Sequence, residues 1–342
     1  MIQDALRRIT DGEDLTQDEA VTVMTEVVEG QATPVQIGGL LAGLRTKREA
    51  VDEIAGFARV MRERAVRVYP RKRPLLDTCG TGGDTCDTFN ISTAAAFVIA
   101  ASGIAVAKHG NRAVSSRCGS ADVLAALGVE LTLTPEQIAE CIDTVGVGFM
   151  FAPHHHPAMA AVAQPRKELG IRTVFNILGP LVNPAGANRQ LVGVFDPDLC
   201  PKVAEVLGIL GCERAMVVHG MNGLDEISTV GPTRISHLQH GRVSTETRIP
   251  SEMFLVPATE EEIAGGSSPE ENAQIILSVL QGEAGPRRDI VSVNAAAGLI
   301  LGGMAEGWRD GVSLAHRMID TGRAYRVLQQ LIEFTQRCAE QG

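Results

Sequence analysis

Three short stretches of the sequence combine glycines with hydroxyl or basic side chains, as phosphate-binding sites do. The first, CGTGGDTCDTFN at residues 79–90, contains Gly80, Gly83 and Asp84. Because glycine has no Cβ, successive main-chain N–H groups can converge on a phosphate. The stretch matches neither the dinucleotide motif GxGxxG in its proper context nor the P-loop motif GxxxxGK[ST]. On its own, a tight structural turn explains it equally well.

The second stretch is NIST, at residues 90–93, directly before an apolar, alanine-rich run. Hydroxyl side chains at a helix start are typical of anion binding and also of ordinary capping. The third stretch is KHGNR, at residues 108–112, followed by Ser115, Ser116 and Ser120. Lys108 and Arg112 could bind a highly charged group through charge-assisted hydrogen bonds. Three such stretches in succession predict a ligand that carries several phosphates.

Two adjacent acids, Asp225 and Glu226, follow the strand-like run AMVVHG. Adjacent acids are often only a solvated turn, but carboxylates at this position favour Mg²⁺, which binds carboxylate and phosphate oxygens. The three histidines 154–156 are a weaker metal candidate. In an extended segment neighbouring side chains point to alternating sides, so the three could not face one ion. We expect them to line a pocket or to precede a helix at Pro157.

Strand-like and helix-like runs alternate around these stretches. The strand-like runs lie at 75–79, 103–111, 147–153, 190–197 and 214–220, and helix-like runs at 93–102, 119–128, 135–146, 157–170 and 201–210 separate them. Such alternation predicts an α/β fold with a mostly parallel central sheet. Ligands of this fold class bind at the carboxyl ends of the strands, where the three stretches fall.

Residues 1–66 have a different pattern and predict helices alone. Thr16 and Thr33-Pro34 are typical helix starts, and apolar residues recur at helical spacing through 47–66. The basic, proline-containing stretch 67–74 indicates a hinge or linker, chiefly a solvated one. We predict a small all-helical domain at 1–66, to which a segment near 165–190 is joined. A hinge at 67–74 and a larger α/β domain at 75–342 follow.

The composition limits the function classes. The 342 residues are 44% hydrophobic and 21% charged, which is typical of a soluble globular protein. The net charge of −10 argues against a nonspecific nucleic-acid binder. Seven scattered cysteines without a CxxC pair predict reduced thiols in a cytoplasmic protein. The N-terminus has no apolar signal segment, and the run 91–107 is too short and too polar to span a membrane.

Taken in order, the stretches CGTGGD, NISTA, KHGNR, GSAD, HPAM, RKELGIRTVFNILGPLVNP and GLDEIS are typical of one family. Over nearly its whole length the sequence resembles the anthranilate phosphoribosyltransferases of tryptophan biosynthesis. The resemblance implies a homodimer that uses Mg²⁺ to transfer the phosphoribosyl group of 5-phosphoribosyl 1-diphosphate (PRPP) to the amine of anthranilate, releasing pyrophosphate. It also implies that the helical domain closes onto the α/β domain about the hinge.

The resemblance further implies roles for individual residues. Those for PRPP are Gly80, Gly83, Asp84, Thr88, Asn90, Ile91, Ser92, Thr93, Lys108, His109, Gly110, Asn111, Arg112, Ala113, Val114, Ser115, Ser116 and Ser120. Those for anthranilate are Gly80, His109, Asn111 and Arg166, and those for magnesium are Ser92, Asp225 and Glu226. Arg166 has this role by resemblance alone, since its position otherwise predicts a solvated helix face. No residue is assigned as a general base.

Three departures, at Cys86, Cys118 and Gln164, and two alternatives accompany this interpretation. Cys86 stands where the family loop often has glycine, and Cys118 follows the serine pair. A pyrimidine nucleoside phosphorylase would share the fold and the glycine loop, but the acid pair and KHGNR favour a diphosphate substrate. A non-catalytic relative that binds nucleic acid would need a basic face, which the net charge of −10 disfavours.

Overall fold

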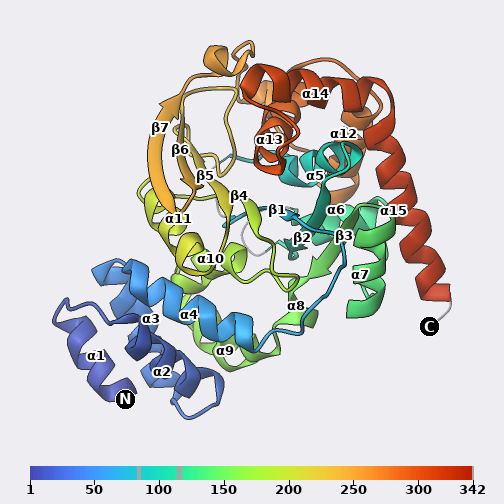
Figure 1. Ribbon diagram of the computed structural model, residues 1–342. Coiled ribbons are helices and arrows are strands. Elements are labelled where there is room, and N and C mark those ends of the chain that lie inside the picture. The colour runs from blue at the N-terminus through green and yellow to red at the C-terminus, as the bar shows by residue number, and fades with distance from the viewer. Residues whose placement is uncertain (83–85, 114–117, 341–342) are drawn as a thin grey trace.

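A seven-stranded sheet in the order β3-β2-β1-β4-β5-β6-β7 forms the centre of the molecule (Figure 1). The computed structural model describes residues 1–82, 86–113 and 118–340. The strands are β1 Leu75–Gly80, β2 Ala105–Gly110, β3 Val147–Phe151, β4 Arg189–Gly193, β5 Arg214–Gly220, β6 Thr233–Gln239 and β7 Arg242–Arg248. The pairs among β1–β5 are parallel, and β6 and β7 are antiparallel additions.

Helices cover both faces of the sheet, because adjacent residues of each strand point to opposite sides. Leu191 packs with the cluster around α5 and α13, whereas Val192 packs with α11 and the N-terminal helices. The first face carries α5 Ile91–Ala101, α6 Ser120–Ala126, α12 Pro269–Leu280, α13 Pro286–Gly302, α14 Trp308–Asp320 and α15 Arg323–Glu340. The other carries α7 Pro135–Thr144 and α11 Leu199–Ile209.

The N-terminal part contains α1 Ile2–Thr10, α2 Gln17–Val28, α3 Pro34–Lys47 and α4 Val51–Glu63. Thr16 and Thr33 cap α2 and α3 through complete capping boxes, as predicted. The predicted helical run from 47 is wrong at its start, since Arg48 has a positive φ of 71° and Ala50 is extended. The fold class, a helical N-terminal part with a larger α/β part, is confirmed.

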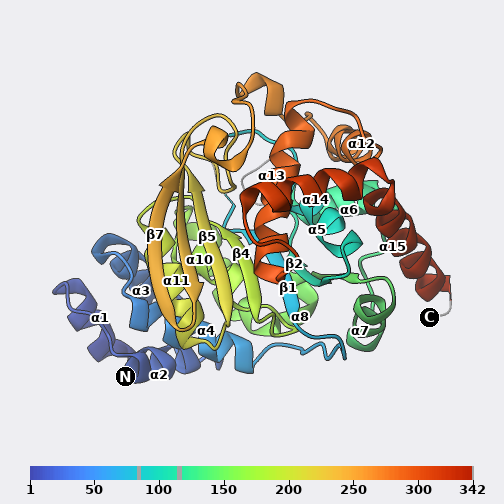
Figure 2. The same ribbon diagram turned by 45° about the horizontal axis from the view of Figure 1, so that its top comes forward.

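Two helices from the middle of the chain pack beside these N-terminal helices (Figures 1 and 2). α9 Ala160–Leu169 contacts α3, and α10 Val174–Leu178 contacts α4. Val162 and Phe175 belong to the same buried cluster as Phe57 of α4. The predicted domain boundaries at 66 and 75 remain a prediction.

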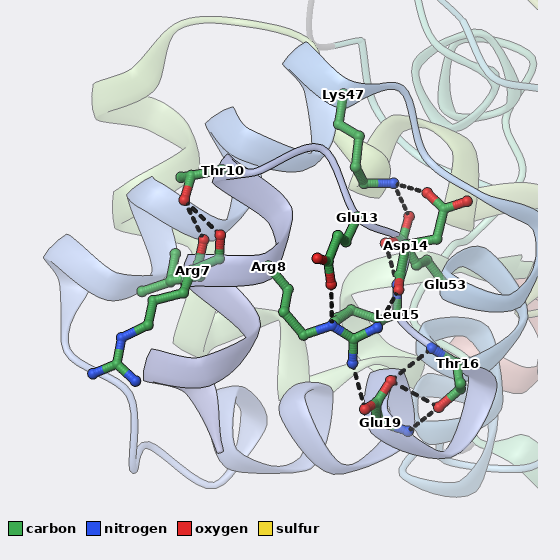
Figure 3. Close-up of polar contacts among 11 residues, drawn as sticks. Arg7, Arg8, Thr10, Glu13, Asp14, Leu15, Thr16, Glu19, Lys47 and Glu53 are labelled. Carbon is green, nitrogen blue, oxygen red and sulfur yellow. Dashed lines mark hydrogen bonds and ion pairs between the residues drawn. The ribbon is translucent and has the colours of Figure 1, made fainter.

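A buried polar network fixes the loop between α1 and α2 (Figure 3). The fully buried Glu53 accepts hydrogen bonds from the main-chain N of Leu15, at 3.0 Å, and of Ala50, at 2.8 Å. Lys47 Nζ lies 2.9 Å from Glu53 and 2.5 Å from Asp14. The buried side chains of Lys47 and Glu53 therefore satisfy each other, and the loop adds the carboxylate of Asp14 and the main-chain N of Leu15 as partners.

Two other sequence expectations need correction. The histidines 154–156 are not extended, because α8 Ala152–His155 contains the first two. The hairpin β6–β7 has no counterpart among the predicted strands, since its polar residues hide the apolar alternation that marks a strand. Short 3₁₀ turns span Pro157–Met159, Gly179–Leu181, Pro250–Met253 and Glu261–Ile263. Among the residues described, no helix is long and apolar enough to cross a membrane.

Candidate active site

The carboxyl ends of the parallel strands meet at one edge of the sheet, and the three predicted phosphate stretches begin there. Gly80 at the end of β1 is in register with Gly193 at the end of β4, and Gly110 of β2 is in register with Phe151 of β3. Five of the predicted residues, Gly83, Asp84, Val114, Ser115 and Ser116, lie outside the described residues. The others can be placed.

The loop after β5, residues 221–226, folds back onto the glycine stretch and brings Asp225 to it. We call this segment the acid loop. Asp225 Oδ2 accepts a hydrogen bond from the main-chain N of Gly82 at 2.9 Å. A Cβ on Gly80 would collide with the Asp225 carboxylate, and a Cβ on Gly193 would collide with the Asp225 carbonyl. Glycine at these two positions therefore permits the close approach of the acid loop. Burial raises the pKa of Asp225, opposed by the Gly82 hydrogen bond.

The neighbouring acid, Glu226, binds the start of α5. Its Oε1 accepts a hydrogen bond from the main-chain N of Ser92 at 3.1 Å. The N-cap residue Asn90 makes no capping bond and instead donates from Nδ2 to the carbonyl of Cys118 at 3.0 Å. Asn90 Oδ1 and Thr93 Oγ1 are buried and have no hydrogen-bond partner among the described residues. These two buried atoms therefore have unused hydrogen-bonding capacity.

Ile91 and Thr88 contribute differently from their polar neighbours. Ile91 is buried in the core, with 1% of its surface exposed, so its side chain faces away from any ligand and only its main chain is available. Thr88 is half-buried and forms an isolated antiparallel bridge with Ala264. The predicted PRPP residues at 88–93 thus lie on the segment that leads into α5 and on the first turn of that helix.

Lys108 is buried at the centre of this edge. Its Nζ donates to the carbonyl of Thr78 at 2.5 Å and lies 3.4 Å from Ser92 Oγ. Burial lowers the pKa of Lys108, and the nearby Asp77 opposes this shift. The ammonium group therefore links the end of β1 to the start of α5.

Asp77 is a site residue that sequence reasoning missed. It is fully buried in β1, and its carboxylate accepts from the main-chain N of His109, at 3.1 Å, and from Asn183 Nδ2, at 2.7 Å. Burial raises its pKa, although Lys108 opposes the shift. An acid inside the apolar strand LLDTC was the available signal, because buried acids need partners.

His156, one of the three histidines expected to line a pocket or to precede a helix, lies against His109. Their ring centroids are 5.0 Å apart in an edge-on arrangement. Burial lowers the pKa of His109 to about 3 and that of His156 to about 4, so both rings are neutral at pH 7. Nδ1 of His109 bonds to the carbonyl of Gly179 at 3.1 Å, which leaves its Nε2 without a hydrogen-bond partner in the described part of the chain. Two uncharged rings with unused nitrogens suit an aromatic ligand.

Arg166 lies on α9, the helix that follows His156 in the chain. Its side chain is half-buried rather than fully solvated. Its guanidinium lies 5.2 Å from the ring centroid of Phe175, and burial lowers its pKa. The expectation of a solvated face from spacing alone is therefore wrong. A cation held on an aromatic ring is available to bind a carboxylate.

The loop after β2 is tied together by Asp122, which sequence reasoning also missed. Its carboxylate accepts from the main-chain N of Ala113, at 2.9 Å, and of Gly119, at 3.0 Å, and it pairs with Arg112 at 2.9 Å. Ser120 Oγ donates to the carbonyl of Asn111 at 3.3 Å. The exposed Asn111 and Arg112 are thus on a loop whose two described ends are joined.

Gly110, at the end of β2, allows the backbone to pack closely against Ser120 and Phe149. A Cβ at this position would overlap Ser120 Oγ and the Phe149 ring. On the glycine stretch, Cys86 Sγ donates to the carbonyl of Asn222 at 3.5 Å. Cys86, which stands where the family loop often has glycine, therefore contacts the acid loop.

Two family models together match most of the chain. The glycosyl transferase family a/b domain matches residues 72–325, and the glycosyl transferase family helical bundle domain matches residues 3–65. The chain is 53% identical to the anthranilate phosphoribosyltransferase of Symbiobacterium thermophilum, covering 97% of both chains. It is 52% identical to that of Pelotomaculum thermopropionicum, covering 98% of this chain and 97% of the other.

The chain belongs to the anthranilate phosphoribosyltransferase family. Two solved structures of the family agree with this assignment. The Thermus thermophilus enzyme superposes with a TM-score of 0.92 at 45% identity, over 97% of this chain and 99% of the other. The Saccharomyces cerevisiae enzyme, in complex with PRPP and Mg, superposes with a TM-score of 0.90 at 27% identity, over 98% of each chain.

For an anthranilate phosphoribosyltransferase, the acid loop can be tested as a magnesium site. Glu226 accepts a hydrogen bond from the main-chain N of Ser92, so Ser92 lies beside this acid. Asp225 accepts one from the main-chain N of Gly82 and so lies against the glycine stretch. Among the described residues, no three His, Cys, Asp or Glu side chains gather as a metal site. Two carboxylates beside a serine are oxygen donors of the kind that Mg²⁺ accepts, because this ion keeps few protein carboxylates and takes other oxygens from phosphates and water.

Proposed function

We propose that this chain transfers the phosphoribosyl group of PRPP to the amine of anthranilate, giving N-(5-phosphoribosyl)anthranilate and pyrophosphate, as a step of tryptophan biosynthesis. One observation carries the proposal. The glycine stretch, the start of α5 and the pair Asp225-Glu226 meet at one edge of the sheet, joined by hydrogen bonds from Gly82 and Ser92 to the two acids. This arrangement supports a site in which main-chain donors for phosphate lie beside two acids that would hold magnesium.

In the proposed reaction the amine nitrogen attacks C1 of the ribose while the bond from C1 to the diphosphate oxygen breaks. The bonding electrons leave with pyrophosphate, and the amine loses one proton. Lys108 and the main-chain N–H groups around the glycine stretch stabilise the departing charge. Mg²⁺, held by Ser92, Asp225 and Glu226, would neutralise part of that charge when bound.

The acceptor is proposed to lie near His109, Asn111 and Arg166. The guanidinium of Arg166 would bind the anthranilate carboxylate, and the neutral rings of His109 and His156 would pack against the aromatic ring. Anthranilate is itself a nucleophile, so holding it over C1 supplies much of the rate by positioning. No general base is assigned.

We further propose the domain division at 1–66, 67–74 and 75–342, a homodimer, and a cytoplasmic location. Closure of the helical part about the hinge would bring the two substrates together and exclude water that would hydrolyse PRPP. The acidic net charge of −10 supports small-molecule substrates rather than nucleic acid.

The test is the fluorescence of anthranilate in the presence of purified protein and PRPP, with and without Mg²⁺. We expect a magnesium-dependent decay that is lost in Asp225→Asn/Glu226→Gln. The control Glu205→Gln, an exposed acid of α11, should react as the wild type does. Constant fluorescence with the wild type would overturn the proposal, and phosphorolysis of thymidine or uridine would then be measured.

A further inference from the structure

A segment far along the chain lies against the residues that join the glycine stretch to α5. We name residues 263–268, between the 3₁₀ turn at Glu261–Ile263 and α12, the brace segment. Ala264 forms an isolated antiparallel bridge with Thr88, and the main-chain N of Gly265 donates to the carbonyl of Asp87 at 2.8 Å. The turn 87–89 is therefore held by main-chain contacts from outside the parallel sheet.

The contact depends on the absence of a side chain at Gly265. A Cβ there would lie 2.8 Å from the main-chain N of Phe89 and 2.8 Å from the carbonyl carbon of Thr88. Both atoms belong to the backbone, so neither can rotate away as a side chain would. The brace segment can approach the turn only with glycine at this position.

The brace segment is itself fixed to helices of the core. Arg287, in the first turn of α13, donates from Nη2 to the carbonyl of Ala264 at 2.8 Å. Asn272 of α12 is 2% exposed and accepts from the main-chain N of Gly266 at 2.8 Å. Ile263 is buried in the main cluster. The position of the turn 87–89 is therefore coupled to two core helices.

Asn272 also lies beside the loop after β2. Burial raises the pKa of the Cys118 thiol, and the side chain of Asn272 opposes this shift. The carbonyl of Cys118 in turn accepts a hydrogen bond from Asn90 Nδ2 at 3.0 Å. The buried amide of Asn272 thus lies between the brace segment and the loop that holds the N-cap of α5. A displaced brace segment would move both loops at once.

We propose that the brace segment positions the phosphate-binding turn for PRPP, with Gly265, Asn272 and Arg287 as positioning residues. This inference rests on the proposed function. These three residues act on the substrate through Thr88, Asn90 and Cys118 rather than by touching it. Their alteration should therefore weaken PRPP binding selectively and leave the acceptor site, built around His109 and Arg166, intact.

The experiment is steady-state kinetics of Gly265→Ala with each substrate varied in turn. We expect KM for PRPP to rise about tenfold, while kcat and KM for anthranilate change less than about twofold, because the lost interaction serves PRPP binding. The control is Gly307→Ala, where a Cβ meets nothing within 4 Å. An unchanged KM for PRPP, or an equal rise in both KM values, would overturn the proposal.

A second pair of variants covers the case in which Gly265→Ala does not fold. Arg287→Ala should raise KM for PRPP about threefold, and Arg287→Lys, which keeps a donor, should restore part of it. A purely structural role would lower the melting temperature in both variants without this difference in KM. An inactive wild type would contradict the proposed function, whereas an active wild type with unchanged Arg287→Ala would contradict only the brace.

Discussion

The main-chain carbonyl of Asp225 lies so close to the α-carbon of Gly193 that a β-carbon at position 193 would overlap it. Gly193→Ala must therefore displace the acid loop. We expect a loss of about 1–3 kcal/mol in the free energy of unfolding and of about 100-fold in kcat, since misplaced catalytic groups are costly. Urea denaturation and the fluorescence assay measure the two effects. Gly231→Ala, whose Cβ meets nothing within 4 Å, should resemble the wild type.

Lys108 offers a test of charge at the phosphate end of the site. Lys108→Met keeps the length of the side chain but removes the ammonium group that bonds to Thr78 and Ser92. We expect kcat/KM for PRPP to fall about 100- to 1,000-fold, as for the loss of one preorganised donor. The exposed Lys72→Met serves as the control. A fall below tenfold would contradict the role given to Lys108.

Arg166 tests the acceptor end. Arg166→Ala should raise KM for anthranilate about 10- to 100-fold, because a hydrogen bond to a charged group contributes about 1.5–3 kcal/mol. KM for PRPP should stay within about twofold of the wild-type value. Lys167→Ala, on the exposed side of the same helix, is the matched control. Equal effects of the two substitutions would remove Arg166 from the anthranilate site.

His156 links the site to acid stability. Burial lowers its pKa to about 4 in the folded protein, against about 6.5 in an unfolded chain. Between these values the unfolded state binds more protons, so the free energy of unfolding decreases as the pH falls from about 6.5 towards 4. The slope from this group approaches about 1.4 kcal/mol per pH unit.

His156→Phe removes this titrating group, so it should flatten the pH dependence of the free energy of unfolding over that range. Urea denaturation at pH 7, 6 and 5 gives the slope. The exposed His154→Phe leaves His156 in place and should keep the wild-type slope. An identical slope in His156→Phe would show that the buried ring does not stay neutral as the pH falls.

Glu53 accounts for the order of the loop between α1 and α2 (Figure 3). Glu53→Ala leaves Lys47 and the main-chain N groups of Leu15 and Ala50 without this acceptor. Because one partner of a buried ion pair is removed, we expect a loss of about 3–5 kcal/mol in the free energy of unfolding. Glu63→Ala removes an exposed ion pair with Arg59 and should cost less than about 1 kcal/mol.

Much of the fold could be predicted because its signals are local. Four of the five parallel strands end at a glycine after an apolar run. Thr16 and Thr33 mark helix starts through bonds to residues three positions later. The hairpin β6–β7 was missed because β7 is polar on both sides and takes its order from pairing with β6. That pairing is a tertiary effect.

The sequence predicts the class of ligand that the candidate site binds. It does not predict the residues that hold the site's loops in place. Three successive stretches of glycines with hydroxyl or basic residues indicate phosphate together, although each alone does not, so Gly80 and Ser92 could be named from sequence. Asp122 and Asn272 carry no such pattern, since their role is to bond main-chain groups far away in the chain or across a loop. Only the folded backbone brings those donors to them.

The outermost strand β7 has a consequence beyond the site. It pairs only with β6 in the described sheet, so its second edge offers unpaired main-chain groups. Such an edge can recruit a strand of another molecule and start aggregation. The sequence RVSTETR places Arg242, Glu246 and Arg248 along it, and charged side chains at an edge oppose that pairing. The polar strand β7, which the sequence pattern does not reveal, thus opposes edge-to-edge association of the sheet with other molecules.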